Sequence, residues 1–344
     1  MSASLVSPPA LSCALPPALN AALTTRLDGR SRQELRLRAL RLSDAYRARQ
    51  PTAGTIRDET DALAYALTRL PATYAATIGV LGRLRDEHPD FAPARLLDAG
   101  CGTGAASWAA SVVWSEVAQV AMLDRSRAFL DLARALAAGS GRAALIAAAF
   151  IDADLTRLPP IPADVDLVVA SYALTELAET ALPAVAEKLW LRVSQTGALV
   201  LIEPGTPRDH ARLMLIRERL ISAGARIVAP CPHQAICPMA GDDWCHFSVR
   251  LPRSRDHMFL KDGVVPFEDE KYSYLVARRV GKPATGRIIA PVRVAKPGIT
   301  ARICGSTGIT ETFVLRRDKP AFDSLRKKDW GDAVVPRAIP EEIA

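Results

Sequence analysis

The chain has 344 residues, of which 49% are hydrophobic, and it carries a formal net charge of +7. This length and composition predict a folded, soluble protein with one large core or two domains. No run approaches the roughly eighteen apolar residues of a membrane span, and the N-terminus lacks the features of a signal peptide. We therefore expect no membrane association and an intracellular, reducing compartment.

Helices are predicted for an N-terminal region over residues 1–90, because apolar residues recur there at helical spacing. Strands then alternate with helices. The expected strands cover residues 95–99, 117–123, 143–151, 165–170 and 198–202. Such alternation predicts a parallel sheet with right-handed crossovers and helices on both faces. The predicted fold class is thus α/β, with a doubly wound, Rossmann-like domain over residues 91–280.

Residues 281–344 are predicted to form a small β module and a tail, because short apolar runs there are broken by Pro and Gly. The segment 278–328 holds thirteen Lys and Arg against three acids, a local charge of +10, so the rest of the chain carries −3. A charge this localised is typical of a surface that binds polyanions, of which nucleic acid is the commonest inside cells. A solvated basic surface is the alternative.

A glycine turn follows the first expected strand, since residues 96–104 read Leu-Leu-Asp-Ala-Gly-Cys-Gly-Thr-Gly. Such a turn lets the backbone approach a nucleotide, and an acid at the end of the next strand, Asp124, can bind ribose hydroxyls. The glycines recur at every second position, unlike the dinucleotide fingerprint. The run closely resembles the first motif of class I S-adenosylmethionine-dependent methyltransferases.

This resemblance extends over the whole domain. Residues 154–159, Asp-Leu-Thr-Arg-Leu-Pro, look like the third motif of these enzymes, and residues 166–172 occupy the place of the fourth. The resemblance implies S-adenosylmethionine as cofactor, with the glycine turn at its methionine part, one acid at the ribose and another at the adenine. The implied cofactor-binding residues are Asp98, Gly100, Gly102, Gly104, Asp124, Asp154 and Ser171.

No catalytic residue is assigned from the sequence. Enzymes that methylate exocyclic amines of bases usually carry an Asn- or Asp-Pro-Pro-aromatic tetrapeptide after the fourth strand, whereas residues 171–174 here read Ser-Tyr-Ala-Leu. A cysteine nucleophile for pyrimidine C5 is also missing, because Cys101 lies within the cofactor turn. Methyl transfer can proceed by proximity and orientation without a dedicated base, so catalysis is compatible with the sequence.

Four cysteines fall in the last third of the chain, with five, seven and fifty-eight residues between them: Cys231, Cys237, Cys245 and Cys304. In a reducing compartment they are expected to be metal ligands rather than disulfides. Four thiolates fit tetrahedral zinc or a four-iron cluster, and the spacing leaves both open. Three of the cysteines lie in a cysteine-bearing segment, residues 230–262.

Several further motifs resemble the methyltransferase-like proteins of the mitochondrial small ribosomal subunit and their bacterial relatives. They include Cys-Pro-His at 231–233, Asp-Trp-Cys-His-Phe-Ser at 243–248, Pro-Phe-Glu-Asp-Glu-Lys-Tyr-Ser-Tyr at 266–274, Arg-Leu-Pro-Ala-Thr-Tyr at 69–74 and Ile-Glu-Pro-Gly at 202–205. This resemblance implies that the four cysteines hold a [4Fe–4S] cluster rather than zinc. It also implies association with the small ribosomal subunit during its assembly.

Three functions follow as hypotheses. The first is a methyltransferase acting on ribosomal RNA, which the basic segment 278–328 would grip. The second is a non-catalytic assembly factor that uses S-adenosylmethionine and the cluster as structural ligands. The third, a small-molecule methyltransferase, leaves the basic segment without a role. We expect a monomer off the ribosome, in the cytoplasm of a bacterium or the mitochondrial matrix of a eukaryote.

Overall fold

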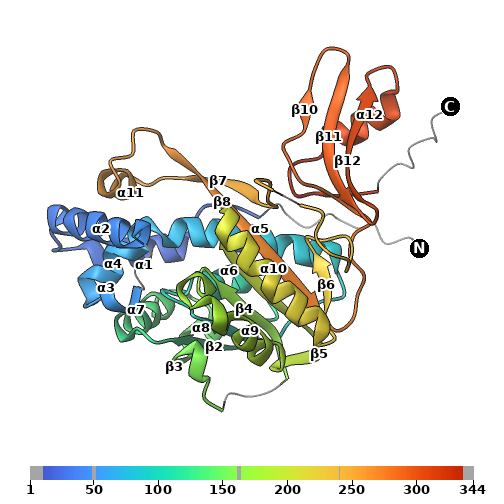
Figure 1. Cartoon of the computed structure of the whole chain (residues 1–344). Helices are drawn as coiled ribbons and strands as arrows, with labels where there is room; N and C mark the ends of the chain where they lie inside the picture. The colour runs from blue at the N-terminus through green and yellow to red at the C-terminus, as the bar shows by residue number, and fades with distance from the viewer. Residues whose placement is uncertain (1–10, 49–51, 161–163, 240, 336–344) are drawn as a thin grey trace, which may run out of the picture.

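The computed structural model describes residues 11–48, 52–160, 164–239 and 241–335 (Figure 1). Within these residues the main sheet has eight strands, in the order β3-β2-β1-β4-β5-β8-β6, with β7 beside β8. The strands are β1 (Arg95–Ala99), β2 (Gln119–Asp124), β3 (Ala149–Asp152), β4 (Val165–Ser171), β5 (Val193–Pro204), β6 (Arg226–Ala229), β7 (Phe247–Pro252) and β8 (Phe267–Arg278).

The strands β1 to β5 pair in parallel, whereas β8 is antiparallel to both β5 and β6. The chain moves outward from β1 to β3 and then returns to the other side of β1 with β4. This reversal is the switch point of a doubly wound sheet, where ligands bind beyond the carboxyl ends of the strands. The predicted α/β class, with the strand order of class I methyltransferases, is confirmed.

Both faces of the sheet are buried, so its central strands are mostly apolar. Leu96 and Val169 contribute to one core and Leu97 and Val168 to the other, as successive residues of a strand point to opposite faces. The helices that cover the first face are α6 (Ala105–Val113), α7 (Arg127–Ala138) and the short α8 (Ala143–Ile146). The second face is covered by α9 (Leu182–Trp190) and α10 (Pro207–Ser222).

The strand predicted over residues 143–151 is wrong in its first half. Residues 143–146 form α8, and only Ala149–Asp152 form β3. A short apolar run has no period that separates a helix from a strand, and alanine favours the helix. Leu145 of α8 is fully buried in the first core, so tertiary packing stabilises this helical turn.

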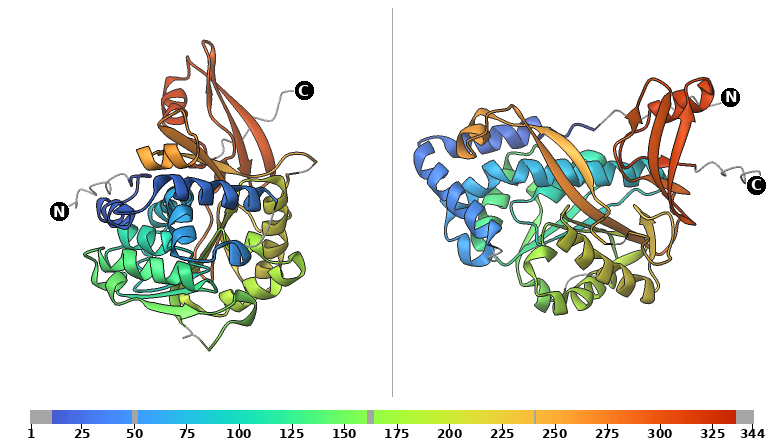
Figure 2. Two further views of the ribbon diagram at one scale, coloured as in Figure 1. Left: turned by 90° about the vertical axis from the view of Figure 1, so that its left-hand side faces the viewer. Right: turned by 45° about the horizontal axis from the view of Figure 1, so that its top comes forward.

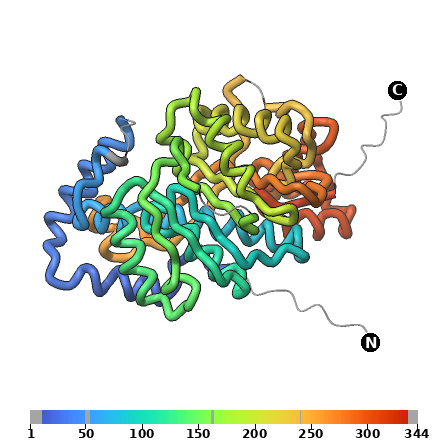
Figure 3. Tube along the Cα trace, turned by 90° about the horizontal axis from the view of Figure 1, so that it is seen from below, coloured from blue at the N-terminus to red at the C-terminus, as the bar shows by residue number. Residues whose placement is uncertain are grey.

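The N-terminal region is helical, as predicted, and shares the first core with the sheet. Leu63 and Leu70 lie in the same apolar cluster as Leu96 of β1. The helices are α1 (Pro17–Leu27), α2 (Arg32–Arg47), α3 (Thr52–Thr55), α4 (Glu59–Thr68) and α5 (Leu70–Glu87). Figure 3 places the helices α1 to α4 and the C-terminal strands at opposite ends of the molecule, whereas Nε of Arg83 on α5 donates to the carbonyl oxygen of Gly331 at 3.0 Å.

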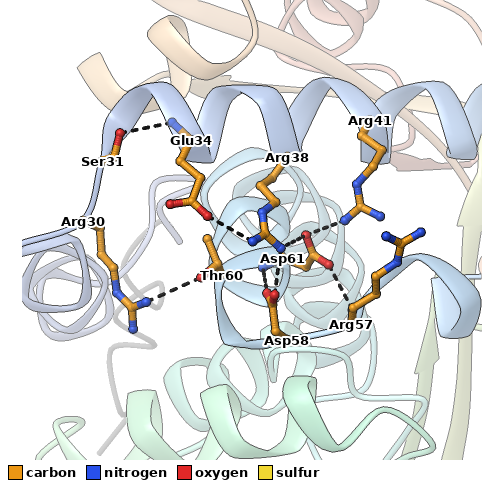
Figure 4. A network of polar contacts seen from close by, with 9 residues as sticks. All are labelled: Arg30, Ser31, Glu34, Arg38, Arg41, Arg57, Asp58, Thr60 and Asp61. Atoms are coloured by element: carbon orange, nitrogen blue, oxygen red, sulfur yellow. Dashed lines mark hydrogen bonds and ion pairs between the residues drawn. The ribbon is translucent and has the colours of Figure 1, made fainter.

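A buried carboxylate joins α2 to α4. Asp61 is fully buried, and it accepts hydrogen bonds from Arg41, from Nη1 of Arg38 at 2.9 Å and from the backbone N–H of Arg57 at 3.0 Å (Figure 4). Burial alone would raise the pKa of Asp61, but the hydrogen bonds from the two arginines outweigh burial and lower it. The ionised form is therefore the one that the folded protein stabilises.

We expect Asp61→Asn to lower the free energy of unfolding by about 2 kcal/mol, because Arg41 loses its bond to a buried carboxylate and Arg38 keeps only Asp58 and Glu34. The loss should be largest near neutral pH. The pKa of Asp61 is lower in the folded state, so its contribution is present above the unfolded-state pKa and disappears as pH falls through the folded-state pKa. Thermal unfolding from pH 7 down to about pH 2 measures both effects.

The control is Asp44→Asn, which removes an exposed acid paired with Arg47 on α2 and should leave stability unchanged. Equal unfolding temperatures for the two variants would contradict the role of Asp61.

Strands β7 and β8 extend beyond the sheet as an arm that carries α11 (Arg255–Leu260) and lies over α2 (Figure 1). Two hydrogen bonds from Nη2 of Arg36 to the carboxylate of Asp262, at 2.8 and 2.9 Å, fix the tip of this arm to α2. The arm thus joins the segment that follows the cysteines to the N-terminal helices.

The C-terminal module is a second, smaller sheet that stands away from the first (Figure 2). Its elements are β9 (Gly286–Ile288), β10 (Arg293–Val294), β11 (Gly298–Gly305), β12 (Gly308–Leu315), α12 (Lys319–Arg326) and β13 (Ala333–Val334). Ile299, Val314 and Phe322 belong to a core of its own between the sheet and α12. Among the described residues, no helix combines the length and the apolar character that crossing a membrane requires.

Candidate functional site

The glycine turn lies directly after β1, at the switch point of the sheet. Gly100, Gly102 and Gly104 have φ values of 74°, 52° and 89°, in the left-handed region that favours glycine. At Gly100 a side chain is also excluded by space, because a Cβ atom would lie 2.5 Å from Cβ of Ala173. The turn therefore passes close to the loop after β4, as a cofactor-binding turn requires.

A pocket of about 810 Å³, including its open mouth, lies beside this turn. It is bounded by the carboxyl ends of β1, β2 and β4 and by the loop after β3. Five of the seven predicted cofactor-binding residues line it, namely Gly100, Gly102, Asp124, Asp154 and Ser171. The structure thus brings together residues that are up to 71 positions apart in the chain.

The two acids of the pocket are held by backbone and hydroxyl donors. Asp124, at the end of β2, accepts from the backbone N–H groups of Gly102 and Ser126, each at 2.8 Å, while burial raises its pKa. Asp154 accepts from Oγ1 and the backbone N–H of Thr156, both at 2.7 Å, and these bonds lower its pKa. Both carboxylates line the pocket, where their remaining lone pairs can accept hydrogen bonds from a ligand.

The other two predicted residues lie behind the pocket rather than on its surface. Asp98 is 1% exposed, and its carboxylate accepts from the hydroxyl of Ser107 at 2.8 Å and from the backbone N–H of Ser107 at 2.9 Å. Burial raises the pKa of Asp98 to about 7. Gly104 is the N-cap of α6. Both residues fix the start of α6 beneath the glycine turn.

Several residues that line the pocket were not predicted to do so from the sequence. Tyr65 of α4 and Leu70 and Thr73 of α5 line it, because the N-terminal helices pack across the first face of the sheet. Arg125 lies 3.8 Å from carboxylate oxygens of both Asp154 and Glu176, and so it connects two sides of the pocket. A basic residue directly after Asp124 was the only available hint of this contact.

Tyr172 follows β4 with a φ of 56°, which is unusual for a residue with a large side chain. Its hydroxyl donates to Oε1 of Glu270 at 2.8 Å, and Arg69 lies 3.6 Å from the same oxygen. The side chain is buried, which raises the pKa of its hydroxyl. Backbone strain of this kind is typical of ligand-binding sites, where neighbouring contacts maintain it.

The loop after Tyr172 is held from below by β5 and α10. Glu203 accepts from the backbone N–H of Leu174 at 3.0 Å, and Nη2 of Arg212 donates to the carbonyl oxygens of Leu174 and Leu177 at 2.9 and 2.7 Å. Burial raises the pKa of Glu203 to about 8. The helix α10 thus supports one side of the cofactor pocket.

A second pocket, of about 510 Å³ with its open mouth, is lined by all four predicted metal ligands. Cys231 and Cys237 follow β6, Cys245 precedes β7, and Cys304 comes from β11 of the C-terminal module. The remaining lining is largely apolar and includes Leu213, Met214, Met239 and Ile289. Four thiols from distant parts of the chain therefore meet in one pocket between the main sheet and the module.

Two buried arginines flank these thiols. Arg217 of α10 is 2% exposed and donates to the carbonyl oxygen of His233 at 2.9 Å. Arg287 of β9 is 1% exposed, lines the pocket and donates to the carboxylate of Glu87 at 2.8 Å and to the carbonyl oxygen of Pro230 at 3.0 Å. Positive charge at this position favours thiolates over thiols.

Burial raises the pKa of the thiols of Cys231, Cys245 and Cys304, that of Cys304 to about 12. Sγ of Cys304 lies 3.7 Å from Nε2 of His233. Within the described ranges, no three or more His, Cys, Asp or Glu side chains are grouped as ligands of a single metal ion. The pocket thus combines the four predicted ligands without forming a finished site for one ion.

Solved structures with a partly similar fold are methyltransferases. Magnesium protoporphyrin IX methyltransferase from Synechocystis, with bound S-adenosylhomocysteine, is 15% identical, with a TM-score of 0.40 over 61% of this chain and 85% of that chain. A methyltransferase from Leishmania major is 13% identical, with a TM-score of 0.40 over 60% of this chain and 74% of its own.

A curated relative is the human ribosome assembly protein METTL17, mitochondrial, which is 29% identical over 311 residues. The match covers 82% of this chain, and it spans 65% of the length of the human protein. The family described as mitochondrial small ribosomal subunit Rsm22 matches residues 59–335, which include both pockets and most of the C-terminal module. The chain therefore belongs to the Rsm22 family.

Proposed function

We propose that this protein is an S-adenosylmethionine-dependent methyltransferase that acts on ribosomal RNA of the small subunit during its assembly. The observation that carries the proposal is the pocket at the switch point, where the glycine turn, Asp124 and Asp154 meet. Bound S-adenosylmethionine would supply an activated methyl group. Asp124 would bind the ribose hydroxyls and Asp154 the adenine amino group, while Asp98 and Gly104 would hold the turn in place.

The second pocket supports a [4Fe–4S] cluster as a structural group. Its donor set fits, because four cysteine thiols are the ligands that such clusters use and two buried arginines would offset the negative charge of the thiolates. Zinc is the alternative with the same ligands. In either form the group would join segment 230–262 to the C-terminal module.

Family membership and the name of the human relative, a ribosome assembly protein, support the small ribosomal subunit as the partner. The protein would then work where small subunits are assembled, in the bacterial cytoplasm or the mitochondrial matrix, and would be a monomer off the ribosome. The basic segment 278–328 would supply the contact with RNA, although not all of it is available. Arg278 and Arg287 are 2% and 1% exposed, so their side chains are buried and cannot contact RNA.

A second candidate is a non-catalytic assembly factor in which the cofactor stabilises the fold. One observation favours it. Where enzymes that methylate base amines hold the target nitrogen, this chain has Tyr172, whose hydroxyl is already bonded to Glu270. The same pocket would then bind S-adenosylmethionine without placing its methyl group near a base.

The two candidates predict different ribosomal RNA. Cells that lack the protein should yield small-subunit RNA that has lost one methyl group by mass spectrometry, and the wild-type gene should restore it, whereas Asp124→Ala should not. The reason is that methyl transfer needs the bound cofactor, whereas an assembly factor transfers no methyl group, so its absence leaves the methylation of the RNA unchanged. Immature subunits with unchanged methylation would reject the enzyme and support the assembly factor. Co-sedimentation with small subunits tests the partner itself.

A further inference from the structure

An aromatic ring lies exposed on the outer face of the C-terminal sheet. In the register of this sheet Arg293 of β10 pairs with Thr300 of β11, and Thr300 pairs with Phe313 of β12. Residues directly opposite one another share a face, so these three side chains form one row across three strands. The ring of Phe313 is 52% exposed, and Leu315, two residues further along β12, shares this face at 38% exposure, while Arg302 and Cys304 occupy the other end of the same face.

The ring lies over a glycine. A Cβ atom on Gly298 would be 2.7 Å from Cζ of Phe313, so only glycine leaves room for the ring to lie along the sheet. The opposite face of the same strands is buried, since Ile299 and Val314 pack into the module core with Phe322 of α12. The side chain of Phe313 is therefore held on a rigid sheet. Binding through this ring should lose little conformational entropy.

The surroundings of the ring are mainly basic. Arg293 lies in the same row, Lys296 is in the turn between β10 and β11, and Arg317 follows the end of β12; all three are exposed. The acid on this face is Glu311, two residues before Phe313. By contrast, Arg316 lies over the ring of Phe322, with its guanidinium 5.1 Å from the ring centroid, and so it belongs to the α12 side.

An exposed aromatic ring on a sheet, with cations at its margin, matches the chemistry of single-stranded nucleic acid. Unpaired bases stack on such rings, and the neighbouring phosphates contact Lys and Arg. A duplex offers no free base face to the ring. We propose that the outer face of β10, β11 and β12 binds a single-stranded segment of RNA, with one base stacked on Phe313. This deepens the proposed function and rests on it for RNA as the partner.

Binding of a single-stranded oligoadenylate of about 12 nucleotides to the full-length protein, followed by fluorescence anisotropy, tests the proposal. We expect Phe313→Ala to weaken binding at least about 10-fold, because stacking contributes strongly for each base. The slope of log affinity against log salt should not change, since no phosphate contact is lost. Phe313→Trp should bind within about 3-fold of the wild type, because it keeps a flat ring.

Matched variants separate stacking from charge. Phe259→Ala removes an exposed ring from the distant arm and should leave affinity unchanged. Arg293→Ala should reduce the salt slope by about 0.7, the value expected for one phosphate contact with a single strand, while Arg326→Ala, on α12, should not. Since the Phe313 side chain is half exposed, its truncation should preserve the unfolding temperature.

The proposal is overturned if Phe313→Ala binds like the wild type, or if it loses the same affinity for a duplex as for a single strand. In either case continued co-sedimentation with small subunits and intact methylation would leave the proposed function standing. If the wild type binds no RNA while it still co-sediments, a protein partner occupies this face, and the RNA proposal again fails. A variant that loses methylation but still binds RNA would have a defect in the cofactor pocket, not in the RNA-binding face.

Discussion

Replacement of Cys304 with serine is expected to abolish iron binding and to loosen the C-terminal module. Cys304 is the one predicted ligand that comes from the module, whereas the other three precede or follow strands of the main sheet. The anaerobically purified wild type should be brown, with broad absorbance near about 400 nm and about four irons per chain. The variant should retain less than about one iron, and it should unfold at a lower temperature because a structural metal site contributes to folding.

The matched control is Cys13→Ser, which changes a half-buried thiol outside the pocket and should keep both colour and iron. Iron and acid-labile sulfide analysis, together with limited proteolysis of the module, gives the measurement. Stoichiometric zinc without iron in the wild type would contradict the iron-sulfur cluster and would support a zinc ion held by the same cysteines. Full iron in the Cys304→Ser protein would remove Cys304 from the ligand set.

Substitution of Asp124 by alanine should weaken the binding of S-adenosylmethionine about 100-fold. A carboxylate that accepts from both ribose hydroxyls makes two charge-assisted hydrogen bonds, each contributing about 1.5 kcal/mol or more. The substitution also releases the backbone N–H of Gly102, which Asp124 holds at 2.8 Å, and so it loosens the glycine turn. Titration calorimetry with S-adenosylmethionine and with S-adenosylhomocysteine measures the change.

The chain offers a close control for this experiment. Asp152 pairs with Asp124 in the register of β2 and β3, but its carboxylate accepts from Arg127 at 2.8 Å and does not line the pocket. Asp152→Ala should therefore bind the cofactor like the wild type. Equal affinities for the two variants would mean that Asp124 is not the ribose ligand.

Local patterns predicted the parts of the site that depend on short segments. The glycine turn needs backbone conformations that only glycine adopts readily, and Asp124 follows from the end of the next strand, so both could be recognised from spacing. The four cysteines were predicted to be ligands of one metal group, in part because thiols are rare in this chain. Their spacing alone did not show how they meet in one pocket, since fifty-eight residues separate Cys245 from Cys304 and the two lie beside different sheets.

Other parts depend on contacts between distant residues. Tyr65 reaches the cofactor pocket only because α4 packs across the sheet, and no motif marks it. The role of the basic segment was also hard to predict from the sequence, because formal charge does not show which side chains are buried. Arg287 counted as a candidate RNA contact, yet it is paired inside the protein with Glu87, two hundred residues away. Tertiary packing thus decided which of these charges face solvent.

The helix α10 is the common mechanical support of both pockets. Arg212 holds the loop beside the cofactor pocket, and Leu213, the next residue, lines the cysteine pocket together with Met214. A helix of sixteen residues moves as a rigid rod, so a shift that widens one pocket also displaces a side of the other. If both pockets bind their proposed ligands, such a shift would couple the two sites, and each ligand would then change the affinity of the other by the same factor.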